Sequence, residues 1–190
     1  FDGMFTPFLL ARTNNNQTIV GIVSSFMAIG CIVASILLSI IKQPEKKLPL
    51  MYFGSYLCLG GITLFGMGRN LVWWCIVVFI GCFGSPIYHT YQTIIIREKV
   101  DTSMQGRVFS LQGLITQALT PLGFLGGGIM ADYIFEPLMK KMSSSENIIT
   151  FFVGRQNGSG IGLIFVVAGL IGIVTLTILK CNPTIKQLDQ

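Results

Sequence analysis

Long apolar runs alternate with short polar segments along most of the chain. A helix that crosses a bilayer needs about 20 mainly apolar residues. Five runs meet this length, and we predict membrane-spanning helices at residues 18–41, 48–68, 71–96, 108–131 and 160–179. The apolar stretch at residues 1–11 has about half the length of a span. We interpret it as the outer half of a sixth helix whose first part lies upstream.

This pattern predicts an all-α, polytopic membrane helical bundle. In hydrocarbon every backbone polar group must be hydrogen-bonded within the protein, so only helices and closed barrels can span. The apolar runs are too long and too uninterrupted for barrel strands. Composition points the same way, because 52% of the residues are hydrophobic and only 11% are charged. We therefore expect residues 1–190 to form one transmembrane unit with the lipid bilayer as a partner.

The basic residues are distributed unevenly between the predicted loops. Eight of the thirteen lie in alternate loops or at the carboxyl end: Lys42, Lys46, Lys47, Arg97, Lys99, Arg107, Lys180 and Lys186. Basic residues favour cytoplasmic loops, so we predict a multi-pass protein of the cytoplasmic membrane with its C-terminus inside. The net charge of +5 is scattered between apolar runs, which argues against a nucleic-acid partner.

No motif for catalysis or metal binding is present in the sequence. The five cysteines lack C-x-x-C or other metal-ligand spacing, and there is a single histidine, His89. Neither a G-x-S-x-G elbow nor a phosphate-binding loop occurs. We predict no enzyme activity, no cofactor and no metal site, with the cysteines serving as reduced packing residues.

Asp2 is the only acidic residue predicted to lie deep in a membrane helix. It precedes the outer end of its helix by about nine residues, or roughly 13 Å. A carboxyl group at that depth is expected to face a cavity, pair with another group or carry a proton. Asp2 is therefore a candidate for proton coupling. In the alternative interpretation the helix begins irregularly and Asp2 is simply hydrated.

Four polar residues share one face of the predicted span at residues 71–96. Ser85, Tyr88, His89 and Gln92 follow i, i+3, i+4, i+7 spacing. Such a face inside a membrane usually borders a water-filled path, so all four are candidate cavity-lining residues, and His89 is a second candidate for proton coupling. The alternative is a hydrogen-bonded histidine close to the cytoplasmic surface.

Small residues recur at helical spacing in two spans, where they predict close helix–helix contact. Thr116 and Gln117 are polar members of the second stripe and candidate cavity-lining residues. The stripes are Gly21, Ser25, Ala28, Ser35 and Ser39 in one span, and Gly113, Thr116, Gln117, Thr120, Gly123 and Gly127 in the other. The outer loop predicted at residues 132–159 carries Tyr133, Phe135, Phe151 and Phe152, which favour anchoring at the membrane surface over a substrate lid.

Several of these segments together resemble a known family. The stretch Gln105-Gly106-Arg107-Val108-Phe109-Ser110, then Pro121-Leu122-Gly123 and Gly128-x-x-Ala131-Asp132, is similar to helix eleven of the macrolide-efflux and enterobactin-exporter branch of the major facilitator superfamily. The continuation Phe135-Glu136-Pro137-Leu138-Met139, with Gly158 to Gly162 opening the last helix, is similar to members of that branch too. The resemblance covers the whole chain as helices seven to twelve.

This resemblance implies a twelve-helix fold whose two halves rock about a central site. Helices seven and ten would line the cavity, and Glu98, Asp101 and Arg107 would lie at a cytoplasmic gate. The partners would be the N-terminal half of the same transporter, a small-molecule cargo and protons. The implied function is proton-coupled efflux of a macrolide, siderophore or peptide-like compound. The alternative is a membrane assembly or accessory protein that transports nothing.

Overall fold

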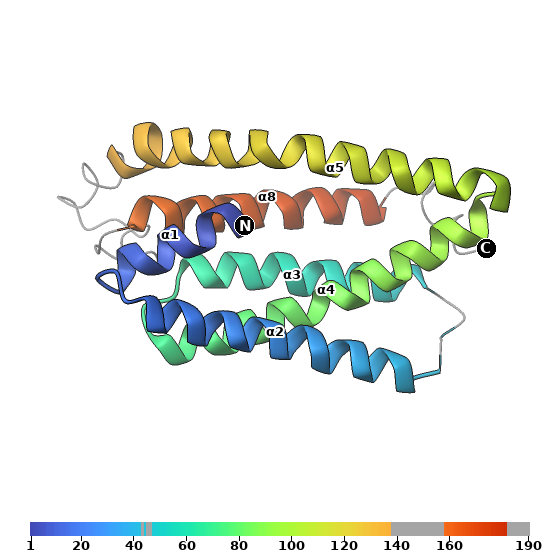
Figure 1. Ribbon diagram of the computed structural model, residues 1–190, viewed down its shortest axis with the longest axis horizontal. Helices are drawn as coiled ribbons and strands as arrows, with labels where there is room; N and C mark the ends of the chain where they lie inside the picture. The colour runs from blue at the N-terminus through green and yellow to red at the C-terminus, as the bar shows by residue number, and fades with distance from the viewer. Residues whose placement is uncertain (43, 45–46, 138–157, 182–190) are drawn as a thin grey trace.

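The chain folds into a bundle of long helices that lie roughly side by side (Figure 1). The computed structural model describes residues 1–42, 44, 47–137 and 158–181, and within these ranges it contains no strand. The helices are α1 (Asp2–Arg12), α2 (Gln17–Ile40), α3 (Leu48–Gly66), α4 (Leu71–Lys99), α5 (Thr102–Met130), the π-helix η1 (Ala131–Phe135) and α8 (Ser159–Cys181).

Among the described residues, five helical segments are long and apolar enough to cross a membrane. They are α2, α3, α4, α5 with its continuation η1, and α8. The helix α1 has eleven residues and is shorter than a span. These segments confirm the predicted all-α, multi-pass membrane bundle.

The helix after residue 101 is longer at both ends than the sequence pattern predicts. It begins at Thr102 and continues through η1 to Phe135, where we expected a loop from residue 132 onward. No glycine or proline stands between Gly128 and Pro137, so nothing in the sequence breaks the helix there. Tyr133 and Phe135 are therefore helical, whereas Phe151 and Phe152 lie outside the described residues.

The turn between α1 and α2 depends on three consecutive asparagines. Asn14 and Asn15 adopt positive φ angles of 51° and 62°, a conformation that asparagine tolerates better than most residues. Asn16 then caps α2, since its Oδ1 accepts a hydrogen bond from the backbone nitrogen of Thr18 at 3.1 Å. This compact turn holds α1 against the start of α2.

Glycines allow α3 to touch α4 almost backbone to backbone. A methyl group at Gly54 would lie 2.7 Å from the Tyr88 backbone nitrogen, and one at Gly61 would lie 2.6 Å from the Gly81 Cα. Lipid tails are as apolar as the side chains, so burying apolar side chains between helices gains nothing from the hydrophobic effect. Helices in lipid are instead held together largely by van der Waals contact, which such close approach increases. The opposite face of α3 packs against α8 through Gly66 and Gly169. Helix α3 is thus the central element of the bundle.

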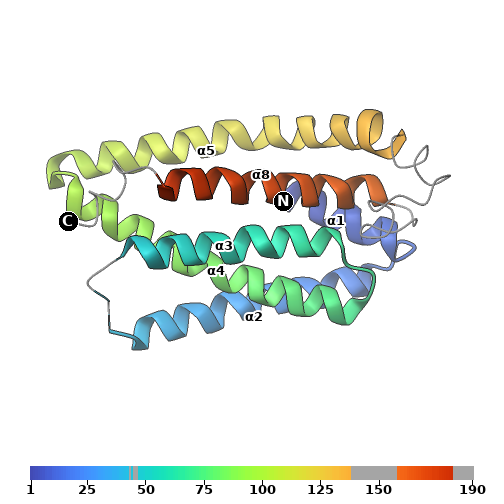
Figure 2. The same cartoon turned by 180° about the vertical axis from the view of Figure 1, so that it is seen from behind.

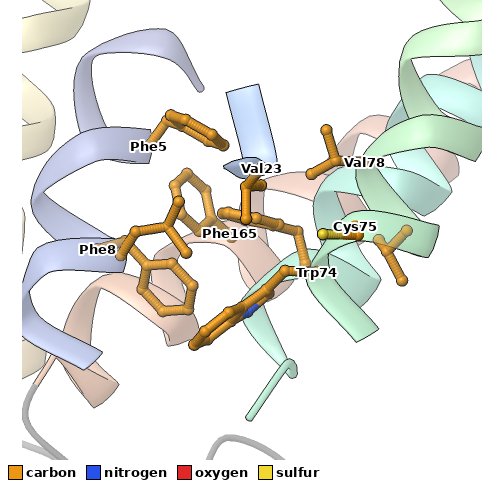
Figure 3. Packing of buried hydrophobic residues seen from close by; sticks show 10 residues of the cluster. Phe5, Phe8, Val23, Trp74, Cys75, Val78 and Phe165 are labelled. Carbon is orange, nitrogen blue, oxygen red and sulfur yellow. The ribbon is translucent and has the colours of Figure 1, made fainter. Parts of the chain in front are cut away.

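An aromatic cluster joins α1 to α3, α4 and α8 at one end of the bundle (Figure 3). Phe65 is fully buried at its centre, and its ring stacks on that of Phe5 with centroids 5.4 Å apart. The Phe165 ring meets the Phe65 ring edge-on, with centroids 5.6 Å apart, and the Phe8 ring packs beside that of Trp74. This packing fixes α1 although that helix is short.

The helix α5 runs along one edge of the bundle and α2 along the opposite edge (Figures 1 and 2). No residue of α5 is buried among the described parts of the chain. Its contacts are mainly with α1, where Phe124 lies beside Gly3 and Gly127 beside Met4. A methyl group at Gly113 or Gly123, members of the predicted small-residue stripe, would meet no other described part of the chain within 4 Å.

The small-residue stripe predicted in α2 is not covered by another helix among the described residues. Gly21, Ser25 and Ala28 are exposed, as are Ser35 and Ser39. Each of the three serine hydroxyls donates instead to a carbonyl oxygen four residues earlier in the same helix. The contact with α4 uses the other face of α2, where a methyl group at Gly30 would lie 2.6 Å from the Phe79 carbonyl oxygen.

Candidate functional site

An open cavity of about 260 Å³ lies where α1, α2, α3 and α4 meet. Its apolar wall consists of Phe1, Met27, Ile62, Phe65, Val77 and Val78, and the glycines Gly61 and Gly81 border it. Because these glycines lack side chains, they leave room at the crossing of α3 and α4. The aromatic cluster closes one end of the cavity through Phe65.

The polar groups of this cavity come from four different helices. They are Asp2 of α1, Cys31 of α2, Cys58 of α3, and Cys82 and Ser85 of α4. Of the described residues that line the cavity, Asp2 alone has a charged side chain, and none is a lysine, arginine or histidine. The cavity therefore combines a mostly apolar wall with a single carboxyl group.

Three thiols surround the cavity and bridge its helices. The Cys31 Sγ donates to the Cys82 carbonyl oxygen at 3.5 Å, which links α2 to α4. The Cys58 Sγ donates to the Gly81 carbonyl oxygen at 3.4 Å, which links α3 to α4. Thiols are weak donors, so these contacts orient the side chains more than they hold the helices together. Within the described ranges no group of three or more His, Cys, Asp or Glu side chains could hold a metal ion.

The structure brings together two of the candidate residues on the first and fourth helices. Asp2 and Ser85 both line the cavity, although 83 positions separate them in the chain. Asp2 is also exposed among the described residues. A carboxyl group in this position can accept a proton or pair with a cation.

The rest of the predicted polar face of α4 lies away from this cavity. Tyr88 and Gln92 are half-buried and His89 is exposed, and none of the three lines the cavity. The Tyr88 and His89 rings pack against each other with centroids 5.0 Å apart. The roles of Asp2 and His89 in proton coupling stay predictions, and the two residues do not line the same cavity.

Thr116 and Gln117 lie on α5, outside the cavity. Both are exposed, and the Thr116 hydroxyl donates to the Gln112 carbonyl oxygen of its own helix at 2.9 Å. The part of the chain that the structure describes places no other helix over them. Their assignment as cavity-lining residues remains a prediction.

The three predicted gate residues lie at the junction of α4 and α5 but do not form one cluster of ion pairs. Glu98 is paired with Lys47, the residue directly before α3. Asp101 precedes α5 and its backbone carbonyl accepts from Met104 and Gln105, while Arg107 is exposed on α5. Gln105 fixes the junction itself, because its Nε2 donates to the carbonyl oxygens of Arg97 and Val100 at 2.9 and 3.0 Å.

The cysteines of the cavity are the residues that sequence reasoning missed. We interpreted them as packing residues, since each lies in an apolar run without metal-ligand spacing. A local signal does exist, because Cys58 precedes Gly61 by one helical turn and Cys82 directly follows Gly81. A cysteine is small and polarisable, and one that lies next to a glycine where two helices cross tends to border the space between those helices.

Comparison with known proteins gives a distant similarity to an efflux protein. Macrolide efflux protein A of Streptococcus pyogenes, and the protein of the same name in its serotype M6 strain, are each 26% identical to this chain over 135 residues. The match covers 70% of this chain and 33% of each relative, so the chain matches about a third of their length. No family model matches the sequence, and no solved structure matches the fold. The chain is a multi-pass membrane protein with distant similarity to a macrolide efflux protein.

Proposed function

We propose that this chain is part of a secondary active transporter of the major facilitator type that exports a drug-like or natural-product compound in exchange for protons. The observation that carries the proposal is the cavity between α1 and α4, which is apolar except for its thiols, Ser85 and the Asp2 carboxyl group. The distant similarity to macrolide efflux protein A supports export as the direction.

The proposed mechanism assigns the proton to Asp2. A carboxyl group on the wall of a cavity inside a membrane protein is able to carry a proton. The mechanism requires that water reach Asp2 from one side of the membrane at a time, so that a proton can enter and leave. An N-terminal half of the same transporter would complete the path on the exposed side of the bundle, where α5 has no buried residue.

Efflux measurements in cells that carry the complete gene test the proposal. Accumulated macrolide, siderophore and peptide-like compounds should leave these cells faster than cells without the gene, and an uncoupler should abolish the difference. Asp2→Asn should reduce uphill efflux to the level of cells without the gene, whereas Asp2→Glu should retain much of it. Unchanged efflux after collapse of the proton gradient would reject proton coupling, and no efflux of any compound would reject export.

A further inference from the structure

A proline interrupts the hydrogen bonding of α4 within the membrane-spanning segment. Pro86 has no backbone N–H, so the carbonyl oxygen of Cys82, four residues earlier, lacks its helical donor. An unpaired carbonyl group is costly in a membrane, and a neighbouring helix commonly supplies the missing donor. The carbonyl group of Cys82 therefore needs a donor from outside α4.

This donor comes from α2. The Cys31 Sγ donates to the Cys82 carbonyl oxygen at 3.5 Å. The two helices are in close contact here, because a methyl group at Gly30 would lie 2.6 Å from the Phe79 carbonyl oxygen. Helix α2 thus crosses α4 one residue before Cys31 and less than one helical turn before Cys82. The contact involves α2 and α4 only, so it does not depend on α1.

The parts of α4 on either side of Pro86 are held very differently. Six buried residues of α4 precede Pro86, namely Trp74, Cys75, Val77, Val78, Gly81 and Gly84. After Pro86 the described part of α4 buries Ile87 and Tyr91, and residues 92–99 are half-buried or exposed. A bend at Pro86 would therefore displace the end of α4 while its first part stayed in the bundle.

We infer that Pro86 is a hinge of α4 and that the Cys31 thiol is the latch of this hinge. While the thiol donates to the Cys82 carbonyl group, α4 continues through Pro86 as one helix. When α2 moves away, the carbonyl group loses this donor and α4 bends at Pro86. Bending of α4 and its separation from α2 therefore occur together. The inference goes beyond the proposed function, because it requires neither a cargo nor a proton.

Cys58 of α3 provides a matched control. Its Sγ donates to the Gly81 carbonyl oxygen at 3.4 Å, nearly the distance at which Cys31 meets Cys82. The residue four positions after Gly81 is Ser85, which has a backbone N–H. Removing the Cys58 thiol therefore takes away a second bond, whereas removing the Cys31 thiol takes away the replacement for the N–H that Pro86 lacks.

The first experiment detects the Cys82 carbonyl group directly, by solid-state NMR of the full-length protein in lipid bilayers. Carbonyl carbon-13 in cysteine and nitrogen-15 in phenylalanine together select the Cys82–Phe83 peptide bond, and loss of the signal in Phe83→Leu assigns it. Cys31→Ala should move the carbonyl resonance to lower chemical shift, because a carbonyl carbon is less deshielded without a hydrogen bond. Cys58→Ala should leave the resonance in place. An unmoved resonance in Cys31→Ala, or equal shifts in both variants, would overturn the inference.

Pro86→Ala tests the coupling between proline and thiol, because alanine restores the N–H that Cys82 lacks. In this background Cys31→Ala should no longer move the resonance. Cys31→Ala should also raise the equilibrium constant of unfolding in detergent about threefold in the wild-type background and leave it unchanged in the Pro86→Ala background. Cys58→Ala should have the same effect in both backgrounds. Equal effects of Cys31→Ala in the two backgrounds would contradict the latch.

The second experiment measures the bend. Spin labels attached through azide-bearing amino acids at positions 40 and 99, which are exposed at the ends of α2 and α4, leave the cysteines untouched. In electron–electron double resonance, Cys31→Ala should shift the distance distribution to longer values, and Cys58→Ala should not. Should Pro86→Ala fail to fold, this comparison decides without it. A distribution that Cys31→Ala leaves unchanged would overturn the hinge.

Discussion

Glu136 lies at the N-terminal end of α8, where its carboxylate Oε2 accepts a hydrogen bond from the backbone nitrogen of Gly160 at 3.3 Å. The first amide groups of a helix have no partner within the helix, and the helix dipole favours negative charge beside them. Glu136 follows directly after η1, so this bond joins the end of the α5–η1 segment to the start of α8. Gly160 is buried at this contact.

Removing the Glu136 side chain should weaken the attachment of α8. Replacement of a capping side chain by alanine costs about 1 kcal/mol, and we expect Glu136→Ala to lower the free energy of unfolding by about that amount. Glu136→Gln should cost less, because it keeps an acceptor and loses only the charge. Thermal unfolding of the full-length protein in detergent measures both. The control is Tyr133→Ala in η1, a residue that is 79% exposed, and an equal effect of the control would contradict the prediction.

The close contact of α3 and α4 should not tolerate even a methyl group. One at Gly84 would lie 2.5 Å from the Gly54 carbonyl oxygen and 2.7 Å from the Leu57 Cβ. Overpacking of this kind costs about 1–3 kcal/mol, so Gly84→Ala should lower the unfolding midpoint clearly.

Gly60 provides the matched control for this substitution. It lies in α3, and a methyl group there would have no neighbour within 4 Å. Gly60→Ala should therefore be neutral or stabilising by up to about 1 kcal/mol, because alanine favours the helix. Similar unfolding midpoints for the two variants would show that the α3–α4 contact is looser than the structure has it.

The existence of the helices follows from the sequence, but the faces that they bury do not. Helix α2 is apolar nearly all round, so hydropathy cannot distinguish its packed side from its outer side. Two sets of small residues in α2 could each form a helix contact. The longer of these, the stripe that includes Ser25 and Ser35, is exposed. Gly30 makes the contact because it faces the Phe79 backbone, a relation that depends on how α2 is rotated against α4.

The cavity was predictable only in part for the same reason. The depth of Asp2 in an apolar segment indicated a carboxyl group beside water, and the structure places it at the cavity. The meeting of Cys31, Cys58 and Cys82 depends on the register of three helices, which local sequence does not encode. His89 shares a predicted helical face with Ser85, yet only Ser85 lines the cavity, because the lining residues of α4 run from Val77 to Ser85 and end one turn before His89.

Phe65 should be the most sensitive position of the aromatic cluster. It is fully buried, and its ring contacts those of Phe1, Phe5, Phe8 and Phe165. Phe65→Ala removes all of these contacts, and a cavity left by phenylalanine costs about 3 kcal/mol or more. Phe53→Ala in the same helix is the control, since Phe53 is 56% exposed. A comparable loss of unfolding free energy in both variants would contradict this ranking.

The ion pair between Lys47 and Glu98 should contribute little to the free energy of unfolding. That small contribution should nevertheless depend on the charges of the two side chains. It joins the start of α3 to the last turn of α4, and the Glu98 side chain is 52% exposed while that of Lys47 is 18% exposed. Exposed pairs contribute about 0.2–1 kcal/mol and weaken with salt. Glu98→Gln should therefore lower the free energy of unfolding by at most about 1 kcal/mol.

Reversing both charges distinguishes the energy of the ion pair from the contributions of the two individual side chains. Glu98→Lys alone should be the more damaging change, because it places two cations together where the start of α3 meets the end of α4. Adding Lys47→Glu should restore most of the loss, and the restored part should shrink as salt is raised. If the double variant is no more stable than Glu98→Lys alone, Glu98 supports this end of the bundle through contacts other than its charge.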